Sequence, residues 1–204
     1  CNLKCVHCYS QSKDIEYPNE LSTKEAKAML DGLAEYGAPV ILFSGGEPLL
    51  REDLMELITY ARDKGLRAVI STNGTLITEE KAEELKSFGL SYVGISLDGL
   101  RETNDKFRGI EGAFDDALQG IRNCMKVGIK VGLRFTINKR NAQDIPGIFE
   151  LIEKEKIPRV CFYHLVYSGR GSRLIEEDLS HEETRRVVDL IIDKTKEAHD
   201  RGNK

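Results

Sequence analysis

Three of the five cysteines lie within the first eight residues, at positions 1, 5 and 8, in the pattern C-x3-C-x2-C. Three thiolates on one short loop can each bind one iron of a cubane cluster, and the fourth iron then lacks a protein ligand. A zinc ion is an alternative, but it needs a fourth ligand, and His7 is poorly placed to supply it beside Cys8. A disulfide fits the uneven distribution less well. The loop therefore predicts an iron–sulfur cluster held by Cys1, Cys5 and Cys8, with one iron open.

Two polar and glycine-rich segments follow apolar runs of strand length. The first is SGGEP at residues 44–48, where two glycines would let the backbone approach a ligand closely. The second is STNG at residues 71–74, whose hydroxyl and amide groups could reach ribose oxygens. Both segments are also consistent with ordinary strand-to-helix turns, since Asn-Gly favours turns for backbone reasons alone.

Four further features of the sequence carry polar or glycine residues that could contact a ligand. ISLDG at residues 95–99 precedes NDKFRG at residues 104–109. Arg134 lies within an apolar strand candidate, where an arginine usually needs an anionic partner. That partner is either a bound carboxylate or a carboxylate on a helix surface. The run from Gly169 to Gly171 is a candidate anion-binding turn.

The cysteine motif, together with these segments in this order, resembles the radical S-adenosylmethionine (SAM) superfamily, in particular enzymes with a SPASM or twitch extension. The resemblance implies a 4Fe–4S cluster and SAM as cofactors. In that family the amino and carboxylate groups of SAM chelate the open iron. An electron from the cluster then cleaves SAM to methionine and a 5′-deoxyadenosyl radical, which abstracts a substrate hydrogen.

The same resemblance assigns contacts to SAM. Gly45, Gly46 and Glu47 are expected to hold the amino group, and Thr72 and Asn73 the nucleoside. The other expected contacts are His7 near the adenine, Ser96, Arg134 at the SAM carboxylate, and Val166 against the adenine. A solvated loop histidine is the alternative for His7. Asn104 stands where the family usually has histidine, which removes a proton-transfer group from that position.

Short apolar runs alternate with amphipathic segments of helical length, as in successive βα units with a parallel sheet. Strands are predicted at 40–43, 66–71, 92–96, 130–137 and 159–165, and helices at 22–36, 51–64, 78–88, 112–127, 144–156 and 180–198. The resemblance implies a parallel (β/α)6 partial barrel. No strand precedes residue 22, so we expect the first strand to lie upstream of Cys1. The chain also lacks an initiator Met, and we interpret it as a segment of a longer protein.

We expect a radical SAM core at residues 1–171 and a helical segment at 172–204 that leads to a C-terminal extension. The stretch from Tyr163 to Ser172 resembles enzymes of haem biosynthesis through siroheme, such as didecarboxysiroheme deacetylase. Removal of a tetrapyrrole side chain is therefore the preferred hypothesis. A SPASM-type enzyme that modifies peptides is the alternative, and a non-catalytic iron–sulfur or zinc module is a third. A flavodoxin or ferredoxin is the expected reductant.

Composition excludes several other classes. The 204 residues carry a net charge of −4 with a pI near 5.7, which argues against an electrostatic nucleic-acid binder. No apolar run reaches the length of a membrane span, and no secretory signal precedes Cys1. A cytoplasmic location is therefore expected. Cys124 and Cys161 lie in apolar surroundings and are expected to be small buried hydrophobes.

Overall fold

The computed structural model describes residues 1–15 and 17–202. The chain divides into two compact units. The first unit contains residues 1–3, 12–96 and 116–131, and the second contains residues 4–11, 97–115 and 132–204. The boundary passes through the cysteine motif, with Cys1 in the first unit and Cys5 and Cys8 in the second.

The first unit is built on three parallel strands. Strands β1 (Val40–Phe43), β2 (Arg67–Thr72) and β3 (Tyr92–Ser96) alternate with helices α1 (Thr23–Glu35), α2 (Leu54–Asp63) and α3 (Glu79–Ser87), and the short 3-10 turn η1 is Pro48–Leu50. Leu42 of β1 pairs with Val69 of β2, and Ile70 of β2 pairs with Val93 of β3. Most of α5 (Ala113–Lys126) also belongs to this unit.

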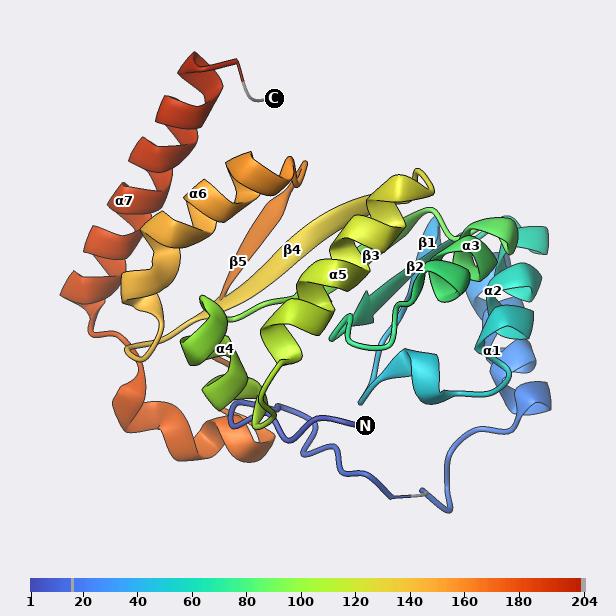
Figure 1. The fold of residues 1–204 in the computed structure, drawn as a ribbon. Coiled ribbons are helices and arrows are strands. Elements are labelled where there is room, and N and C mark those ends of the chain that lie inside the picture. Colours follow the sequence, from blue (N-terminus) through green and yellow to red (C-terminus); the bar gives the residue numbers. More distant parts are fainter. Residues whose placement is uncertain (16, 203–204) are drawn as a thin grey trace. The chain divides into compact units, whose positions relative to one another are not determined.

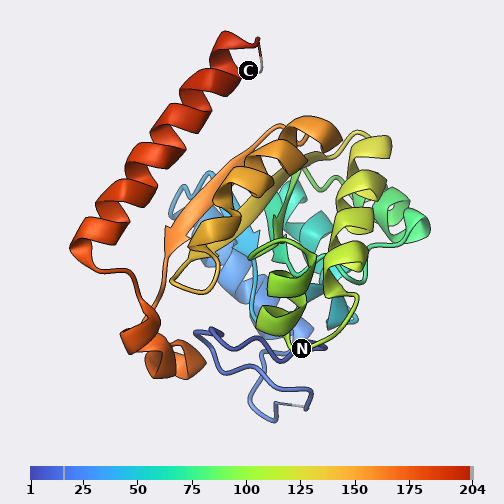
Figure 2. The same cartoon turned by 60° about the vertical axis from the view of Figure 1, so that its left-hand side comes forward.

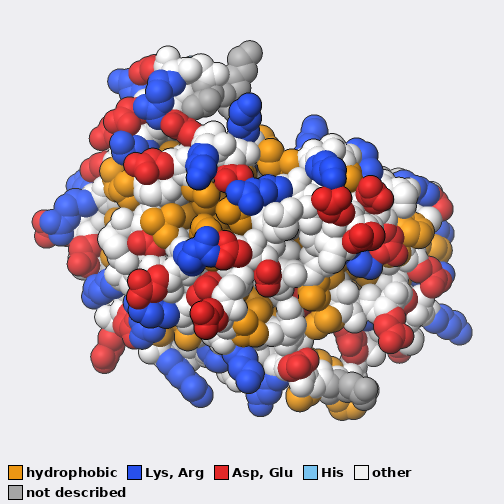
Figure 3. Space-filling view, viewed as in Figure 1, with side chains coloured by type: hydrophobic (Ala, Val, Ile, Leu, Met, Phe, Trp, Pro, Cys, Tyr) orange, Lys and Arg blue, Asp and Glu red, His pale blue; other side chains and the backbone are white. Residues whose placement is uncertain are grey.

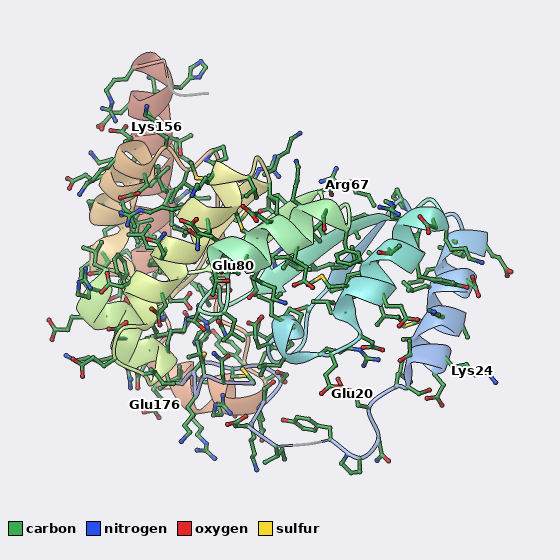
Figure 4. The ribbon with its side chains drawn as sticks, turned by 45° about the vertical axis from the view of Figure 1, so that its right-hand side comes forward. Glu20, Lys24, Arg67, Glu80, Lys156 and Glu176 are labelled. Atoms are coloured by element: carbon green, nitrogen blue, oxygen red, sulfur yellow. The ribbon has the colours of Figure 1, made fainter. Side chains whose placement is uncertain are left out.

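Apolar side chains join α1 and α2 to this sheet. The core between them consists of Ala26, Leu30, Leu57, Ala61 and Leu66, with Ile41 and Phe43 of β1 packed against it. Figure 1 shows α1 and α2 side by side, and Figure 4 shows the Lys24 side chain leaving α1 on the outer side. Ser22 and Glu25 form a capping box, which fixes where α1 begins.

The second unit contains the last two strands. Its elements are α4 (Arg101–Arg108), β4 (Lys130–Ile137), η2 (Ala142–Asp144), α6 (Ile145–Glu155), β5 (Val160–His164), η3 (Gly169–Glu177) and α7 (His181–Asp200), although residues 130 and 131 of β4 belong to the first unit. Strands β4 and β5 are parallel, with Leu133 opposite Val160 and Ile137 opposite His164. Figure 2 shows η3 leading from β5 into the long helix α7.

The predicted βα alternation is confirmed, and the strand order is β1-β2-β3-β4-β5. Two helical segments are missing from the sequence prediction. Helix α4 is not predicted because its sequence, RETNDKFR, contains Phe107 as its only large apolar residue and therefore shows little helical periodicity. Segment η3 carries two glycines in its first turn, which is typical of a loop.

Charged side chains of both signs are interspersed over the face shown in Figure 3, as the mixed-charge helix sequences lead one to expect. In the part of the chain that the structure describes, no helix is both long and apolar enough to cross a membrane.

The two isolated cysteines differ in burial. Cys124 on α5 is fully buried, as predicted, whereas Cys161 on β5 is partly exposed.

Burial raises the pKa of the Cys124 thiol to about 12. Because the thiolate is the nucleophile, we expect iodoacetamide at pH 8 to leave Cys124 unmodified in the folded chain and to alkylate it in urea. Peptide mass spectrometry measures both outcomes, and rapid labelling of Cys124 in the folded chain would contradict the prediction.

Candidate active site

In the first unit the SGGEP turn presses directly on Cys1. A Cβ at Gly46 would lie 2.8 Å from the Cys1 Cβ and 3.2 Å from Ser12, so only glycine fits this approach. The Cys1 ammonium group donates to the Lys13 carbonyl oxygen at 3.0 Å. Two of the predicted site residues, Cys1 and Gly46, are therefore in contact.

Glu47 is buried and bonded to the chain itself. Its Oε1 accepts from the Thr72 hydroxyl at 2.7 Å and from the Leu49 N–H at 3.1 Å, and its Oε2 accepts from the Asn73 N–H at 2.9 Å. Burial raises the pKa of the Glu47 carboxyl, and these hydrogen bonds act in the opposite direction. The carboxylate thus ties the SGGEP turn to the end of β2.

The Asn73 side chain fastens the cysteine loop to the same strand end. Its Nδ2 donates to Asn2 Oδ1 at 2.8 Å, and its Oδ1 accepts from the Thr75 N–H at 2.9 Å. Asn2 in turn donates to the Thr75 hydroxyl at 2.9 Å. In this structure the Thr72 side chain therefore holds Glu47, and the Asn73 side chain holds Asn2, the residue next to Cys1.

A cavity of about 600 Å³ opens beside these groups in the first unit. Cys1, Gly46 and Glu47 line it together with Leu50 and Arg51. Arg51 forms ion pairs with Asp53 and with Glu20, which Figure 4 labels in the loop before α1. The cavity therefore offers space for a polar ligand next to the first cysteine.

In the second unit the cysteine loop is held from two sides. The Lys4 N–H donates to the Arg108 carbonyl at 3.1 Å, and the Val6 N–H to the Phe107 carbonyl at 2.9 Å. From η3, the Arg170 N–H donates to the Cys8 carbonyl at 2.9 Å, and its Nε to the Cys5 carbonyl at 2.7 Å.

The run from Gly169 to Gly171 is thus occupied by the cysteine loop. A Cβ at Gly169 would lie 2.3 Å from the Tyr9 carbonyl oxygen and 2.5 Å from that of Cys8. In place of the expected anion, this turn packs against the backbone carbonyl groups of the cysteine loop.

A buried cation faces Cys5. Arg108 Nη1 lies 3.5 Å from the Cys5 Sγ, and Arg108 Nη2 donates to Asp98 Oδ2. Burial by itself would lower the pKa of the Arg108 guanidinium, but the negative charges of Asp98 and Cys5 outweigh it and hold that pKa above its ordinary value. The Cys5 sulfur therefore has a positive charge within hydrogen-bonding distance.

The His7 side chain is only 14% exposed and packs against the chain, so it is not the solvated loop histidine of the alternative. Its ring packs on Phe107 with centroids 4.9 Å apart, and its Nε2 lies 3.3 Å from Asp98 Oδ2. Burial lowers the pKa of His7, and Asp98 opposes that shift. His7 is thereby fixed between its two cysteine neighbours.

Asp98 and Arg108 are functional candidates that the sequence analysis does not assign. Asp98 Oδ1 accepts from the Thr136 N–H at 2.7 Å, and Asn104 Oδ1 accepts from the Asp98 N–H at 3.0 Å. Asn141 donates to the Asp98 carbonyl at 3.0 Å. Both residues belong to motifs recognised in the sequence, but their pairing is a tertiary contact. Asn104 serves here as a structural acceptor.

The remaining predicted contacts are placed as follows. Ser96 ends β3, and Gly45 is exposed with φ +143°. Arg134 lies on β4, with its guanidinium 6.0 Å from the Tyr163 ring centroid. Val166 follows β5 and is 55% exposed. Their roles toward SAM stay predictions.

The donor set fits an iron–sulfur cluster. Cys1, Cys5 and Cys8 are free thiols, and the Arg108 guanidinium lies beside the Cys5 sulfur. Among the residues with described positions, no three His, Cys, Asp or Glu side chains converge on one point that could hold a metal ion. A cubane needs a different arrangement, because each thiolate binds its own iron atom.

Residues 1–152 match the Radical SAM superfamily. The chain belongs to this family. Membership confirms the expected class, radical SAM enzymes, and implies SAM and a 4Fe–4S cluster as cofactors. The five-stranded sheet and the fold match below confirm the expected partial (β/α) barrel. In a solved structure, native anSMEcpe with bound AdoMet, the matching region covers 100% of this chain and 59% of that chain, with a TM-score of 0.81 and 20% sequence identity.

Curated relatives of this radical SAM chain include two enzymes whose names refer to haem-type products. It is 69% identical over 202 residues to Fe-coproporphyrin III synthase of Methanosarcina barkeri (strain Fusaro / DSM 804), covering 99% of this chain and 51% of that protein. It is 45% identical to pre-heme d1 synthase of Dinoroseobacter shibae, covering 100% of this chain and 50% of that protein. The chain spans about half the length of these relatives.

Proposed function

We propose that the chain binds a 4Fe–4S cluster through Cys1, Cys5 and Cys8 and cleaves SAM reductively to remove hydrogen from a tetrapyrrole in haem biosynthesis. The observation that carries the proposal is the 69% identity to Fe-coproporphyrin III synthase over 99% of this chain. The substrate class is an iron-containing tetrapyrrole with carboxylate side chains. The cluster supplies the electron that cleaves SAM, and the cleavage supplies the radical that takes the substrate hydrogen.

The residues of the first unit hold the turn that meets the SAM amino group. Gly46 lets the backbone of this turn approach Cys1. Glu47 accepts three hydrogen bonds from the chain, so its contribution includes fixing the turn against Thr72 and Asn73. Thr72 and Asn73 lie at the end of β2 that Glu47 fixes, and in this proposal they contact the nucleoside.

The remaining contacts come from His7, Ser96, Arg134 and Val166. His7 and Val166 would flank the adenine with apolar surface, and Arg134 would bind the SAM carboxylate with its fork of N–H donors. Residues 1–171 form the radical SAM core in this proposal, and residues 172–204 form a helical segment; the last two of these lie outside the described residues. A cytoplasmic flavodoxin or ferredoxin supplies the electron.

The first test is SAM cleavage by the anaerobically reconstituted chain with dithionite. We expect methionine and 5′-deoxyadenosine in equal amounts. Cys5→Ala should reduce both to the level without enzyme, because a cluster with two protein thiolates is not retained. Cys124→Ala is the matched control, since this buried thiol is no cluster ligand in the proposal, and it should cleave SAM as the parent chain does. A chain that holds the cluster but never forms 5′-deoxyadenosine would refute SAM cleavage.

The second test concerns the substrate class. An iron tetrapyrrole deuterated on its carboxylate side chains is incubated with the reconstituted chain, SAM and dithionite. We expect deuterium in the 5′-deoxyadenosine, measured by mass spectrometry, because the radical takes its hydrogen from the substrate. Absence of deuterium with tetrapyrroles, together with transfer from a deuterated peptide, would replace the tetrapyrrole by the peptide alternative.

A further inference from the structure

A buried ion pair lies directly behind the second cysteine. Arg108 is 6% exposed and Asp98 is 1% exposed. One end of the Arg108 guanidinium donates to Asp98, and the other end lies 3.5 Å from the Cys5 Sγ. The cation therefore stands between a carboxylate and a thiol.

The fold holds this cation rigidly against the cysteine. Arg108 is the last residue of α4, and its carbonyl accepts from the Lys4 N–H next to Cys5 at 3.1 Å. Asp98 is fixed in turn by the Thr136 N–H at 2.7 Å. Moving the Asp98 side chain away would break its hydrogen bond to the β4 backbone, and moving the Arg108 guanidinium away would break its bond to Asp98.

Stability alone does not explain such a pair. Removing two charges from water costs several kcal/mol for each ion, and a buried ion pair is often no more stable than an apolar pair of the same volume. Arg108 Nη1, which does not contact Asp98, faces the Cys5 Sγ instead. Such an arrangement is expected where the positive charge of the arginine acts on a group bound to the cysteine.

We propose that Arg108 is a positioning residue that acts through Cys5 and raises the reduction potential of the cluster, with Asp98 limiting the effect. The inference rests on the proposed function, because it requires Cys5 to bind the cluster. Hydrogen bonds to sulfur and nearby charge are the protein's main means of setting such potentials. Reduction adds one negative charge, so a fixed cation stabilises the reduced cluster more than the oxidised one.

The test is a redox titration of the reconstituted chain, without SAM, followed by EPR of the reduced cluster. At the midpoint potential of the parent chain, Arg108→Gln should lower the ratio of reduced to oxidised cluster about tenfold, which equals about 59 mV for one electron. Asp98→Asn should raise the ratio, because it removes the opposing negative charge and keeps an oxygen that can accept from Thr136.

Two further variants separate a charge effect from a folding effect. Arg140→Gln makes the same change at an exposed arginine of the second unit, one that pairs with Glu177, and it should leave the potential unchanged. The double variant Arg108→Gln/Asp98→Asn leaves no buried charge unpaired, so it protects the fold if Arg108→Gln alone is unstable. Its potential should lie between those of the two single variants.

The outcomes distinguish this inference from the proposed function. If Arg108→Gln and Asp98→Asn shift the potential in the same direction, or not at all, the inference is overturned while the cluster assignment stands. If the parent chain binds no cluster, both are overturned. Opposite shifts of the two single variants, with an unchanged Arg140→Gln, would support the role of Arg108.

Discussion

Gly169→Ala should lower the free energy of unfolding by about 4 kcal/mol, through overpacking and backbone strain together. The new Cβ would lie within 2.5 Å of the carbonyl oxygens of Tyr9 and Cys8, which belong to the backbone and cannot rotate away. The cysteine loop must shift, so we also expect iron binding after reconstitution to fall severalfold. Urea denaturation and an iron assay measure the two effects.

Gly112→Ala is the matched control for this variant. Gly112 has φ +85° in the same unit, and a Cβ there would meet no atom within 4 Å. Gly112→Ala therefore carries the backbone strain, worth about 1–2 kcal/mol, but not the overlap. Equal losses for the two variants would show that the contact with the cysteine loop does not limit the substitution at Gly169.

Glu47→Ala should also be strongly destabilising, by about 4 kcal/mol. The carboxylate accepts from the Thr72 hydroxyl and from the N–H groups of Asn73 and Leu49. Each buried donor left without a partner costs about 1–3 kcal/mol. The melting temperature and urea midpoint of the variant measure this loss.

Glu56→Ala tests whether that effect belongs to the buried site. Glu56 lies on α2 of the same unit and forms an ion pair with Lys27 in which its side chain is 55% exposed. Exposed pairs contribute at most about 1 kcal/mol, so this variant should remain close to the parent chain. A loss at Glu47 no larger than that at Glu56 would contradict the role of the carboxylate in fixing the turn.

Local patterns explain why much of the fold is predictable. A capping box fixes the start of α1, and apolar runs of four to eight residues mark the strands, because both signals depend on neighbours in sequence. Helix α4 lacks such a signal: it is stabilised by its contacts with the cysteine loop, which the periodicity of eight mostly polar residues does not show.

The residues of the candidate site likewise fall into those that local sequence patterns indicate and those that only the tertiary structure identifies. The spacing of Cys1, Cys5 and Cys8 predicts an iron–sulfur cluster without reference to the rest of the fold, because the three proposed ligands lie on one short loop. The occupant of the Gly169 turn and the acceptors around Asn73 are different, since a glycine or an amide gives no indication of what it will contact. Those assignments required the structure.

The sequence by itself determined the family, the cofactor class and the alternation of strands and helices, since each of these is encoded in residues that are close along the chain. Only the tertiary structure decided that Arg108, 103 residues after Cys5, is the cation at that sulfur. With 30 basic and 34 acidic residues, the chain offers far too many possible ion pairs for composition to select one. The choice is made by packing, because a buried charge is tolerated only where the fold brings its partner within hydrogen-bonding distance.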